Sequence, residues 1–581
     1  MKTWYRLFLV LIMLLLLAGC VEIKTTEPPP TAGIPILTIE NLATSTATQP
    51  EPPPTDTLEP TPTTPKVTHP EGYGWWNDLV FYELHVRSFY DSNGDGIGDF
   101  KGIIEKLDYL NDGDPLTTTD LGVGAIWMMP IHPTTTTHGY DVIDYYDVNP
   151  QYGTMEDFKL LVDEAHTRGM RVIIDLVLNH SSSQNPWFIQ SRDKNSPYRD
   201  WYVWSDTNPG FTGQWGQQVW YPTSSGFYYA FFWEGMPDLN YTNPAVTEEM
   251  QNVTRFWLED VGIDGFRLDA IGSLIEKGST TVETPETHAW LKAYYQFYKS
   301  INPEAFTVGE VWRENAVVIP YVQNKEVDLA FDFDLAAALL SSVNAEDPQG
   351  FMQVYRYQTT QFPEGQFGTF LANHDLARVM TQLGNSTDKA KVAATLYLTL
   401  PGVPFIYYGE EIGMVGDGPD EMERRPMQWS GDEDAGFTTG EPWKAVDNGF
   451  RTANVEVEKK LTVSLLNYYR TLVNLRNQYP TLRYGSLVFI LNRDAGLYSM
   501  ARQYEGEIFV VLVNMSGREI SNYTLYLEKS TLTEGGYTCQ PLMGGTESAE
   551  LQVSKNGGLY GFTPVEELKP YQSVLLNCSS N

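Results

Sequence analysis

Three acidic residues stand where they could take part in breaking a covalent bond. Asp269, Glu310 and Asp375 each lie at or just after the end of a short apolar run, a pattern typical of strands buried on both faces. The carboxyl ends of parallel barrel strands meet at one mouth, so we expect these side chains to converge. Converging charges repel one another and are costly to desolvate, which indicates a use in chemistry. Paired carboxylates suit glycosidic cleavage, in which one attacks the sugar and the other protonates the leaving oxygen.

Other polar residues accompany these carboxylates. Arg267 lies two positions before Asp269, so both side chains would point to the same face of a strand, and the arginine would keep Asp269 ionised. Further candidates follow the third and seventh apolar runs of the chain: Asp175, Asn179, His180 and His374. Any one of them could be structural, but as a set they predict an active site.

A second group of oxygen-bearing residues lies in the segment 91–99. Its side-chain oxygens stand at alternate positions, with a glycine sixth, as in loops that wrap a calcium ion. The twelfth residue is Gly102 rather than Glu and the loop follows a strand, so the segment is not an EF-hand. The predicted ligands of Ca²⁺ are Asp91, Asn93, Asp95, Ile97 and Asp99, the alternative being a solvated turn.

Eight apolar runs alternate with helical patterns, and these elements would position the candidate residues. Amphipathic stretches such as 154–168 and 247–261 fall between the runs. This alternation predicts an α/β fold, a (β/α)₈ TIM barrel spanning 73–180 and 246–485. The predicted strands are 79–84, 124–129, 172–178, 265–269, 306–311, 329–333, 368–372 and 404–408.

Two segments differ from the barrel pattern. The stretch 181–245 is far longer than a loop between a strand and a helix, so we expect a small inserted domain. It is rich in aromatic residues, some of which could stack on sugars while others build its own core. The segment 486–581 has short runs separated by turn residues, which predicts a C-terminal antiparallel β-sandwich domain.

Four segments resemble the signature regions of the α-amylase family, glycoside hydrolase family 13, in family order. They are Asp175–His180, Gly265–Asp269, Gly309–Trp312 and Phe370–Asp375. The resemblance covers about residues 73–581. It implies a retaining hydrolase of α-glucosidic bonds in which Asp269 is the nucleophile, Glu310 the general acid and base, and Asp375 holds ring hydroxyls of the substrate.

The same resemblance assigns supporting roles. His180 and His374 would donate hydrogen bonds to sugar hydroxyls, Arg267 would support the nucleophile, and Tyr140 matches the residue on which the cleaved sugar stacks. The segment 91–99 resembles the calcium loop of the oligo-1,6-glucosidase branch.

Residues that sort the family by specificity give a mixed result. Met236–Asn240 combines features of the oligo-1,6-glucosidase and neopullulanase forms, which suggests an intermediary subfamily. Thr137 replaces an aspartate of strictly exo-acting relatives, and Ala270 resembles α-1,4 enzymes. Both favour an α-amylase acting on starch-type α-glucans. One alternative is an oligosaccharide α-glucosidase, because the segment Arg424–Trp429 resembles a segment of the glucosidase branch. The others are a transglycosylating cyclomaltodextrinase or neopullulanase and a non-catalytic glucan-binding surface protein.

The N-terminus is typical of an exported lipoprotein. Lys2 and Arg6 precede an apolar run that is too short to span a bilayer, so residues 1–19 are predicted to be a signal peptide. Leu17–Cys20 resembles the bacterial lipobox, in which Cys20 carries the lipid; an ordinary signal peptide is the alternative. Residues 20–72 are rich in Thr and Pro and predict a linker. We therefore expect an extracytoplasmic, membrane-anchored protein.

Composition narrows the partners further. With 39 basic and 74 acidic residues the net charge is −35, which disfavours nucleic acid as a partner and is consistent with the neutral α-glucan that the resemblance implies. We expect a monomer. Besides Cys20 the chain has only Cys539 and Cys578. In an oxidising compartment these two can form a disulfide, the alternative being two buried thiols.

Overall fold

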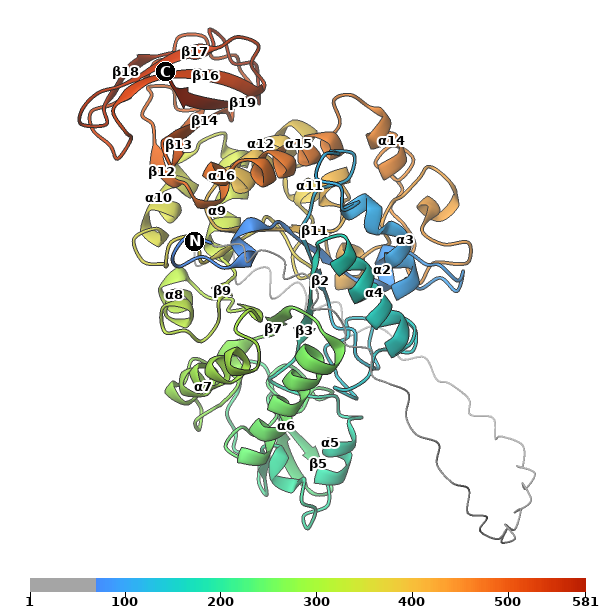
Figure 1. Ribbon diagram of the computed structural model, residues 1–581. Helices are drawn as coiled ribbons and strands as arrows, with labels where there is room; N and C mark the ends of the chain where they lie inside the picture. The colour runs from blue at the N-terminus through green and yellow to red at the C-terminus, as the bar shows by residue number, and fades with distance from the viewer. Residues whose placement is uncertain (1–68) are drawn as a thin grey trace, which may run out of the picture. The chain divides into compact units, whose positions relative to one another are not determined.

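The computed structural model describes residues 69–581 and places a parallel β-barrel at their centre (Figure 1). The predicted signal peptide, Cys20 and residues 21–68 of the predicted linker lie outside the described residues. The eight barrel strands fall on the eight predicted apolar runs: β1 (Phe81–Leu84), β2 (Ala125–Met128), β3 (Arg171–Leu176), β7 (Gly265–Leu268), β8 (Phe306–Gly309), β9 (Leu329–Ala330), β10 (Gly368–Thr369) and β11 (Val403–Tyr407).

The barrel is nearly closed. Its strands are hydrogen-bonded in the order β10-β11-β1-β2-β3-β7-β8-β9, all parallel, and a single parallel bridge between Phe331 and Gly368 joins the two ends. Side chains alternate between the two faces of each strand, and both faces are apolar: Phe81 and Trp127 fill the interior, whereas Tyr82 and Ile126 pack against the outer helices. Burial on both faces explains why the strands were recognisable as continuous apolar runs.

Helices surround the barrel strands, as Figure 1 shows for α3 (Phe100–Leu110), α4 (Met155–Thr167), α6 (Pro244–Arg255) and α7 (Pro285–Ile301). The predicted amphipathic stretches form α4, capped by Thr154, and α6 with the π-helical turn Phe256–Val261. The longer helices are α3 (Phe100–Leu110), α4 (Met155–Thr167), α6 (Pro244–Arg255), α7 (Pro285–Ile301), α8 (Asn315–Gln323), α9 (Phe333–Ala345), α10 (Gln349–Gln358), α12 (Thr387–Thr399) and α15 (Leu465–Gln478). The shorter ones are α2 (Val86–Phe89), α5 (Pro186–Ser191), α11 (Val379–Gln382), α13 (Asp420–Glu423), α14 (Val455–Lys460) and α16 (Pro480–Tyr484).

The long segment after β3 carries a small antiparallel sheet of its own. Its strands β4 (Trp204–Ser205), β5 (Trp220–Thr223) and β6 (Gly226–Tyr229) pair in the order β4-β6-β5. Trp220, Tyr229 and Phe231 form a separate core with Val219, so many aromatic residues of the segment are structural. The inserted element is confirmed, while the boundaries 181 and 245 stay predictions.

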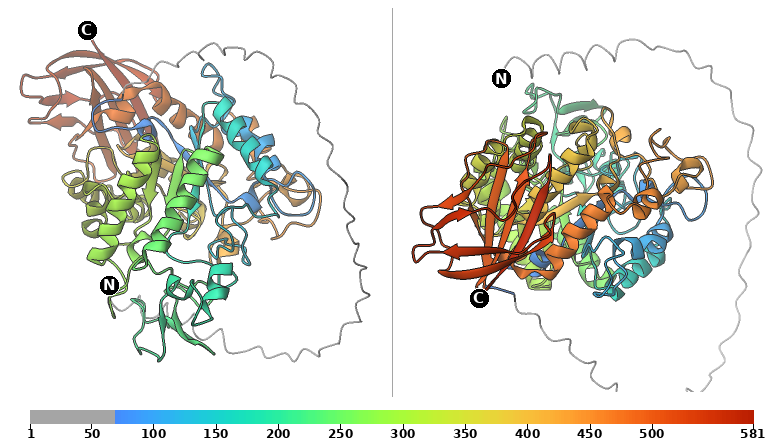
Figure 2. Two further views of the ribbon diagram at one scale, coloured as in Figure 1. Left: turned by 60° about the horizontal axis from the view of Figure 1, so that its bottom comes forward. Right: turned by 90° about the horizontal axis from the view of Figure 1, so that it is seen from above.

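A C-terminal antiparallel sheet is confirmed, and it curls around its own core. Its strands run in the order β12-β13-β14-β19-β16-β17-β18-β15 and lie side by side in red in Figure 2. Side chains from strands far apart in this order, such as Val510 of β14 and Leu559 of β18, share one apolar core. The strands are β12 (Ser486–Phe489), β13 (Leu497–Tyr504), β14 (Glu507–Asn514), β15 (Leu525–Leu527), β16 (Gly535–Met543), β17 (Ala549–Val553), β18 (Leu559–Phe562) and β19 (Ser573–Ser580).

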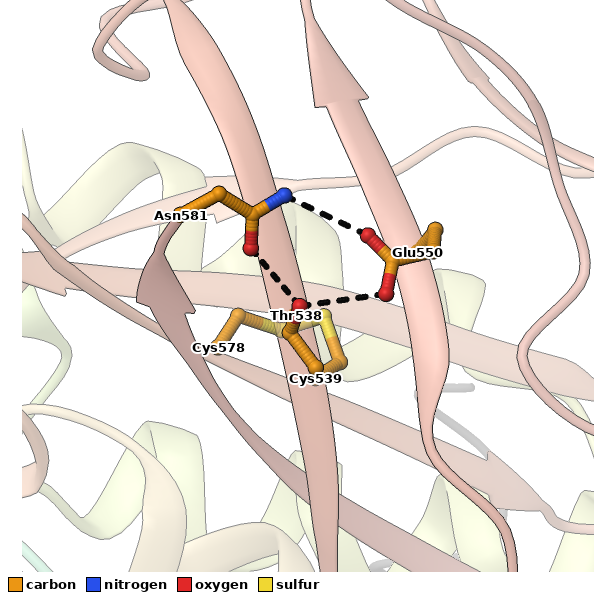
Figure 3. Close-up of a disulfide and its surroundings, with 5 residues drawn as sticks. All are labelled: Thr538, Cys539, Glu550, Cys578 and Asn581. Carbon is orange, nitrogen blue, oxygen red and sulfur yellow. Dashed lines mark hydrogen bonds between the residues drawn. A yellow bond between two sulfur atoms is a disulfide. The ribbon is translucent and has the colours of Figure 1, made fainter.

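The predicted disulfide lies in this sheet. Cys539 of β16 stands directly opposite Cys578 of β19, and their sulfur atoms are bonded (Figure 3). Beside it the Thr538 hydroxyl donates to Asn581 and Glu550, tying the end of the chain to β16 and β17. The bond joins residues 39 positions apart and so restricts the unfolded chain.

Within residues 69–581 no helix is both long and apolar enough to cross a membrane.

Candidate active site

Arg267 and Asp269 lie at the carboxyl end of strand β7, at the same end of the barrel. Arg267 is the last residue but one of the strand and Asp269 follows the strand directly. As the two-residue spacing predicted, both side chains lie together, with Nη1 of Arg267 2.8 Å from Oδ1 of Asp269. Asp269 is only 7% exposed and Arg267 only 1%, so this ion pair is shielded from water.

Glu310, which follows β8, binds the same guanidinium. Its Oε2 lies 2.9 Å from Nη2 of Arg267 and also accepts the backbone N–H of Ala270 at 3.0 Å. Ala270 adopts a left-handed backbone with a φ of 44°, a strain of about 1 to 3 kcal/mol for a residue with a side chain. The strained turn points the N–H of Ala270 at Glu310. Separately, Arg267 binds two carboxylates that follow neighbouring strands, Asp269 and Glu310.

The segment after β10 adds Asp375 and His374. The Nε2 of His374 lies 3.1 Å from Oδ2 of Asp375, and its Nδ1 lies 2.6 Å from Oε1 of Glu83 on β1. The other oxygen of Asp375 accepts a hydrogen bond from Arg424 at 2.7 Å. Asp375 therefore lies between two cationic groups, and its side chain remains 31% exposed at the barrel mouth.

Tyr140 and Asp175 belong to the same hydrogen-bonded cluster as His374 and Arg267. The Tyr140 hydroxyl lies 2.6 Å from Nε2 of His374 and donates to Asp175 at 3.2 Å. Asp175 also accepts from Arg267 at 2.5 Å and from the indole of Trp127 at 3.2 Å. Tyr140 also stacks on the ring of His374 at 5.6 Å. Its position is therefore fixed by hydrogen bonds at one end and by ring packing along its length.

His180 lies next to the inserted element. Its backbone forms an isolated bridge with Asp238, and its ring meets Phe232 edge-on at 5.3 Å. Within residues 69–581 its buried Nε2 has no hydrogen-bond partner. Burial lowers the pKa of His180 to about 3, so the ring is neutral. A neutral imidazole with one free nitrogen suits a hydrogen bond to a ligand hydroxyl.

The charges of this cluster influence one another. Burial lowers the pKa of His374, but Asp375 and Glu83 outweigh it and raise this pKa to about 10, so the ring is a cation. Burial raises the pKa of Asp375, but His374 and Arg424 outweigh it and hold this pKa well below its usual value. Burial raises the pKa of Asp269 to about 8 although Arg267 opposes it. The expectation that Arg267 by itself keeps Asp269 ionised is therefore too simple, because burial favours the protonated form of this carboxyl near neutral pH.

A pocket of about 100 Å³ opens beside Glu310 on the side of the inserted element. Trp215 of the insert and Trp312, two residues after Glu310, both line it. These indoles are 65% and 54% exposed, and Trp312 is stacked on Phe333 at 4.9 Å. Exposed, braced aromatic faces next to an acid are suited to stacking on a sugar ring.

Comparisons with known proteins agree with this geometry. A family model described as the alpha amylase catalytic domain matches residues 83–485. The chain belongs to the α-amylase family.

Individual relatives of this family are similar over most of the chain. "Alpha-amylase 3" of Dictyoglomus thermophilum is 39% identical over 460 residues, 78% of this chain and 87% of its own. An oligo-1,6-glucosidase of Parageobacillus thermoglucosidasius is 32% identical, over 79% of this chain and 94% of its own. The crystal structure of an α-amylase from H. orenii superposes with a TM-score of 0.74 at 41% identity, covering 86% of this chain and 99% of its own.

The structure brings all seven residues predicted for this α-amylase-family site to one end of the barrel. Asp269, Glu310, Asp375, Tyr140, Arg267 and His374 form one hydrogen-bonded cluster, and His180 lies beside it. Sequence reasoning missed Glu83, which binds His374, and did not give Arg424 its contact with Asp375. The partners of Glu83 and Arg424 lie 291 and 49 residues away in the chain, so no local pattern could show these contacts.

The predicted calcium loop is strongly ordered by its own backbone. Asp91 Oδ1 accepts the N–H groups of Asn93 and Gly94, while Asp99 accepts from Ser92 and caps α3 by accepting from Gly102. Gly96 has a φ of 88°, and a Cβ there would lie 1.9 Å from the carbonyl of Glu441, so only glycine fits.

The donor set of this loop fits a hard cation. Asp91 and Asp99 are each 5% exposed, and their hydrogen-bond partners are neutral N–H and O–H groups. With Asn93, Asp95 and the carbonyl of Ile97 they offer only oxygen ligands, as Ca²⁺ prefers. Within residues 69–581 no three His, Cys, Asp or Glu side chains gather as a metal-binding group, so calcium binding stays a prediction.

Proposed function

We propose that this α-amylase-family glycoside hydrolase cleaves α-1,4 bonds in starch, maltodextrins and related α-glucans, with retention of configuration. The observation that carries the proposal is the single guanidinium of Arg267, which binds Asp269 and Glu310 together. Two carboxylates on one guanidinium lie close enough to act on the same glycosidic bond, and a separation of about 5 Å is typical of retaining enzymes.

The reaction proceeds in two displacements. Asp269 attacks the anomeric carbon while Glu310 gives its proton to the departing oxygen, which forms a covalent glycosyl-enzyme. Glu310 then removes a proton from a water molecule that attacks the same carbon and releases Asp269. The first step needs Asp269 in its ionised form and Glu310 carrying the proton that it donates.

The remaining residues hold the sugar ring. Tyr140 offers a stacking face, and Asp375 accepts hydrogen bonds from ring hydroxyls, which favours a distorted ring in the transition state. His180 donates a hydrogen bond to a hydroxyl. His374, whose two ring nitrogens contact Glu83, Asp375 and Tyr140, donates to a hydroxyl where the sugar displaces one of these contacts. The free Nε2 of His180 supports its role, because a buried donor without a partner needs one from a ligand.

Three observations support an α-amylase that cuts α-1,4 bonds within the chain. Thr137 is exposed and stands where strictly exo-acting relatives have an aspartate that narrows the cleft. An uncharged threonine there leaves room for longer chains. The relatives named α-amylase are 39% and 41% identical to this chain. Ala270, directly after Asp269, is the residue of α-1,4 enzymes in the resemblance.

An oligosaccharide α-glucosidase or a transglycosylating cyclomaltodextrinase-like enzyme is the second candidate. Arg424, which begins the segment 424–429, binds Asp375, and an oligo-1,6-glucosidase is among the relatives. The third candidate function is a non-catalytic glucan-binding protein. It is disfavoured because Asp269, Glu310 and Asp375 are all present.

We also propose a calcium ion in the loop formed by Asp91, Asn93, Asp95, Ile97 and Asp99. Bound there, the ion would neutralise the buried carboxylates and stiffen the loop against Phe437, whose carbonyl accepts the N–H of Asp91. Export and lipid attachment at Cys20 would place the enzyme outside the cytoplasm and would allow the disulfide to form.

The decisive experiment is a product profile on soluble starch, maltotriose, panose and cyclodextrin. Internal cuts in starch with panose intact support the α-amylase. Release of single glucose units from chain ends, or cleavage of panose, would support the α-glucosidase instead, and ring opening of cyclodextrin the cyclomaltodextrinase.

A further inference from the structure

The pocket beside Glu310 contains a second carboxylate that the mechanism above does not use. Glu283 lines this pocket together with Glu310, Trp215 and Trp312. It comes from the segment between β7 and α7 rather than from a strand end. Its side chain is 17% exposed, so the carboxylate faces the pocket rather than bulk solvent.

The backbone of Glu283 is held in an unusual conformation. Its φ is 55°, in the left-handed region that non-glycine residues rarely occupy. Its N–H donates to the carbonyl of Gly272 at 2.8 Å, which fixes the strained turn against the residues that follow Asp269. Strained residues of this kind persist where the surrounding structure holds them, and they cluster at functional sites.

The side chain is also fixed, but only through one oxygen. Oε2 accepts the hydroxyl of the buried Tyr321 at 2.6 Å and lies 3.8 Å from Nε2 of His288. Oε1 lies against Gly272, where a Cβ would come within 2.4 Å of it, and no other residue of the described part donates a hydrogen bond to it. The carboxylate is thus oriented in advance and keeps one oxygen available.

We propose that Glu283 is a specificity-determining residue of the leaving-group side, where its free oxygen accepts hydrogen bonds from hydroxyls of the departing sugar. Stacking on Trp215 and Trp312 does not depend on where the hydroxyls of a sugar lie. A fixed carboxylate accepts hydrogen bonds only from hydroxyls at certain positions, so it can select among sugars. Gly272 makes room for this oxygen, and Tyr321 acts as a positioning residue. The inference rests on the proposed function, because it assigns a partner within the same cleft.

The test compares two leaving groups in the Glu283→Gln variant. Maltotetraose releases glucose, which carries hydroxyls, whereas 4-nitrophenyl α-maltotrioside releases nitrophenol, which has no sugar hydroxyls. We expect kcat/KM for glucose release to fall about tenfold and that for nitrophenol release to stay within about twofold, as for loss of a charge-assisted hydrogen bond. Glu286→Gln, which removes a nearby acidic residue outside the pocket, is the matched control and should change neither value.

Equal losses on both substrates would show a structural role and overturn the inference, as would no loss on either. Tyr321→Phe, which frees the carboxylate without removing it, should give a smaller loss confined to maltotetraose and keeps the test decisive if Glu283→Gln fails to fold. Wild-type enzyme inactive on both substrates would instead overturn the proposed function, so the two failures are distinguishable.

Discussion

Glu310 stands between two unlike walls of the cleft. On one side lie Asp269, Arg267, Asp375 and His374, a buried cluster of alternating charges joined by short hydrogen bonds. On the other side lies a pocket lined by Trp215 and Trp312, with the fixed carboxylate of Glu283. In the proposed mechanism the first wall stabilises developing charge on one sugar, and the second contacts the leaving group. The difference between the walls therefore leads us to expect that rate and specificity depend on separate elements of the same cleft.

The largest expected effect comes from the residue shared by both walls. Glu310→Gln should lower kcat on maltotetraose by about 10³- to 10⁴-fold, since the proton donor is lost. The loss should be much smaller on α-maltotriosyl fluoride, whose fluoride departs without protonation, and steady-state kinetics on both substrates measure it. Glu304→Gln, an exposed residue before β8, should have wild-type kinetics. Equal losses on both substrates would contradict the assignment of the acid.

The charged wall should be sensitive to loss of a single cation. Arg424→Ala removes the partner 2.7 Å from Asp375 and should lower kcat/KM on starch by about 10- to 100-fold, as for a charge-assisted hydrogen bond. Arg424→Lys should recover part of this activity because it restores a positive charge. A variant with unchanged kcat/KM would show that Asp375 does not need this partner.

The two walls should also differ in their response to pH. Because burial raises the pKa of Asp269 to about 8, this carboxyl holds a proton below this pH and is ionised above it. We therefore expect kcat/KM to fall as pH falls through about 8, since a protonated Asp269 cannot attack the sugar. Trp312→Ala should leave this acidic limb in place; a shift of the limb would show that the walls are coupled.

The smallest effect is expected on the aromatic wall itself. Trp312→Ala should raise KM for maltotetraose by about 3- to 10-fold with little change in kcat, through lost stacking on the leaving sugar. The exposed Tyr560 of β18, 64% accessible and in the C-terminal sheet, provides the control Tyr560→Ala. A fall in kcat with unchanged KM would place Trp312 in the chemistry instead.

Sequence reasoning predicted the two walls unequally, for physical reasons. Asp269 and Glu310 end strands that are buried on both faces, so a continuous apolar run reveals both the strand and its terminal carboxylate. Glu283 lies in a segment without periodicity, and its backbone angle depends on Gly272, so nothing local marked it. In the C-terminal sheet, β13 and β14 were visible as apolar runs, whereas β16 contains two glycines and a proline and carries partly exposed residues.

The central claim is that Asp269 forms a covalent bond to the sugar while Glu310 serves as acid and base. A 2-deoxy-2-fluoro or 5-fluoro α-glycosyl fluoride slows release of such an intermediate, and mass spectrometry of the digested protein locates the label. We predict a single labelled peptide with the sugar on Asp269, and release of the α-anomer on turnover. Labelling of another carboxylate such as Asp375, or release of the β-anomer without any labelled peptide, would contradict the account.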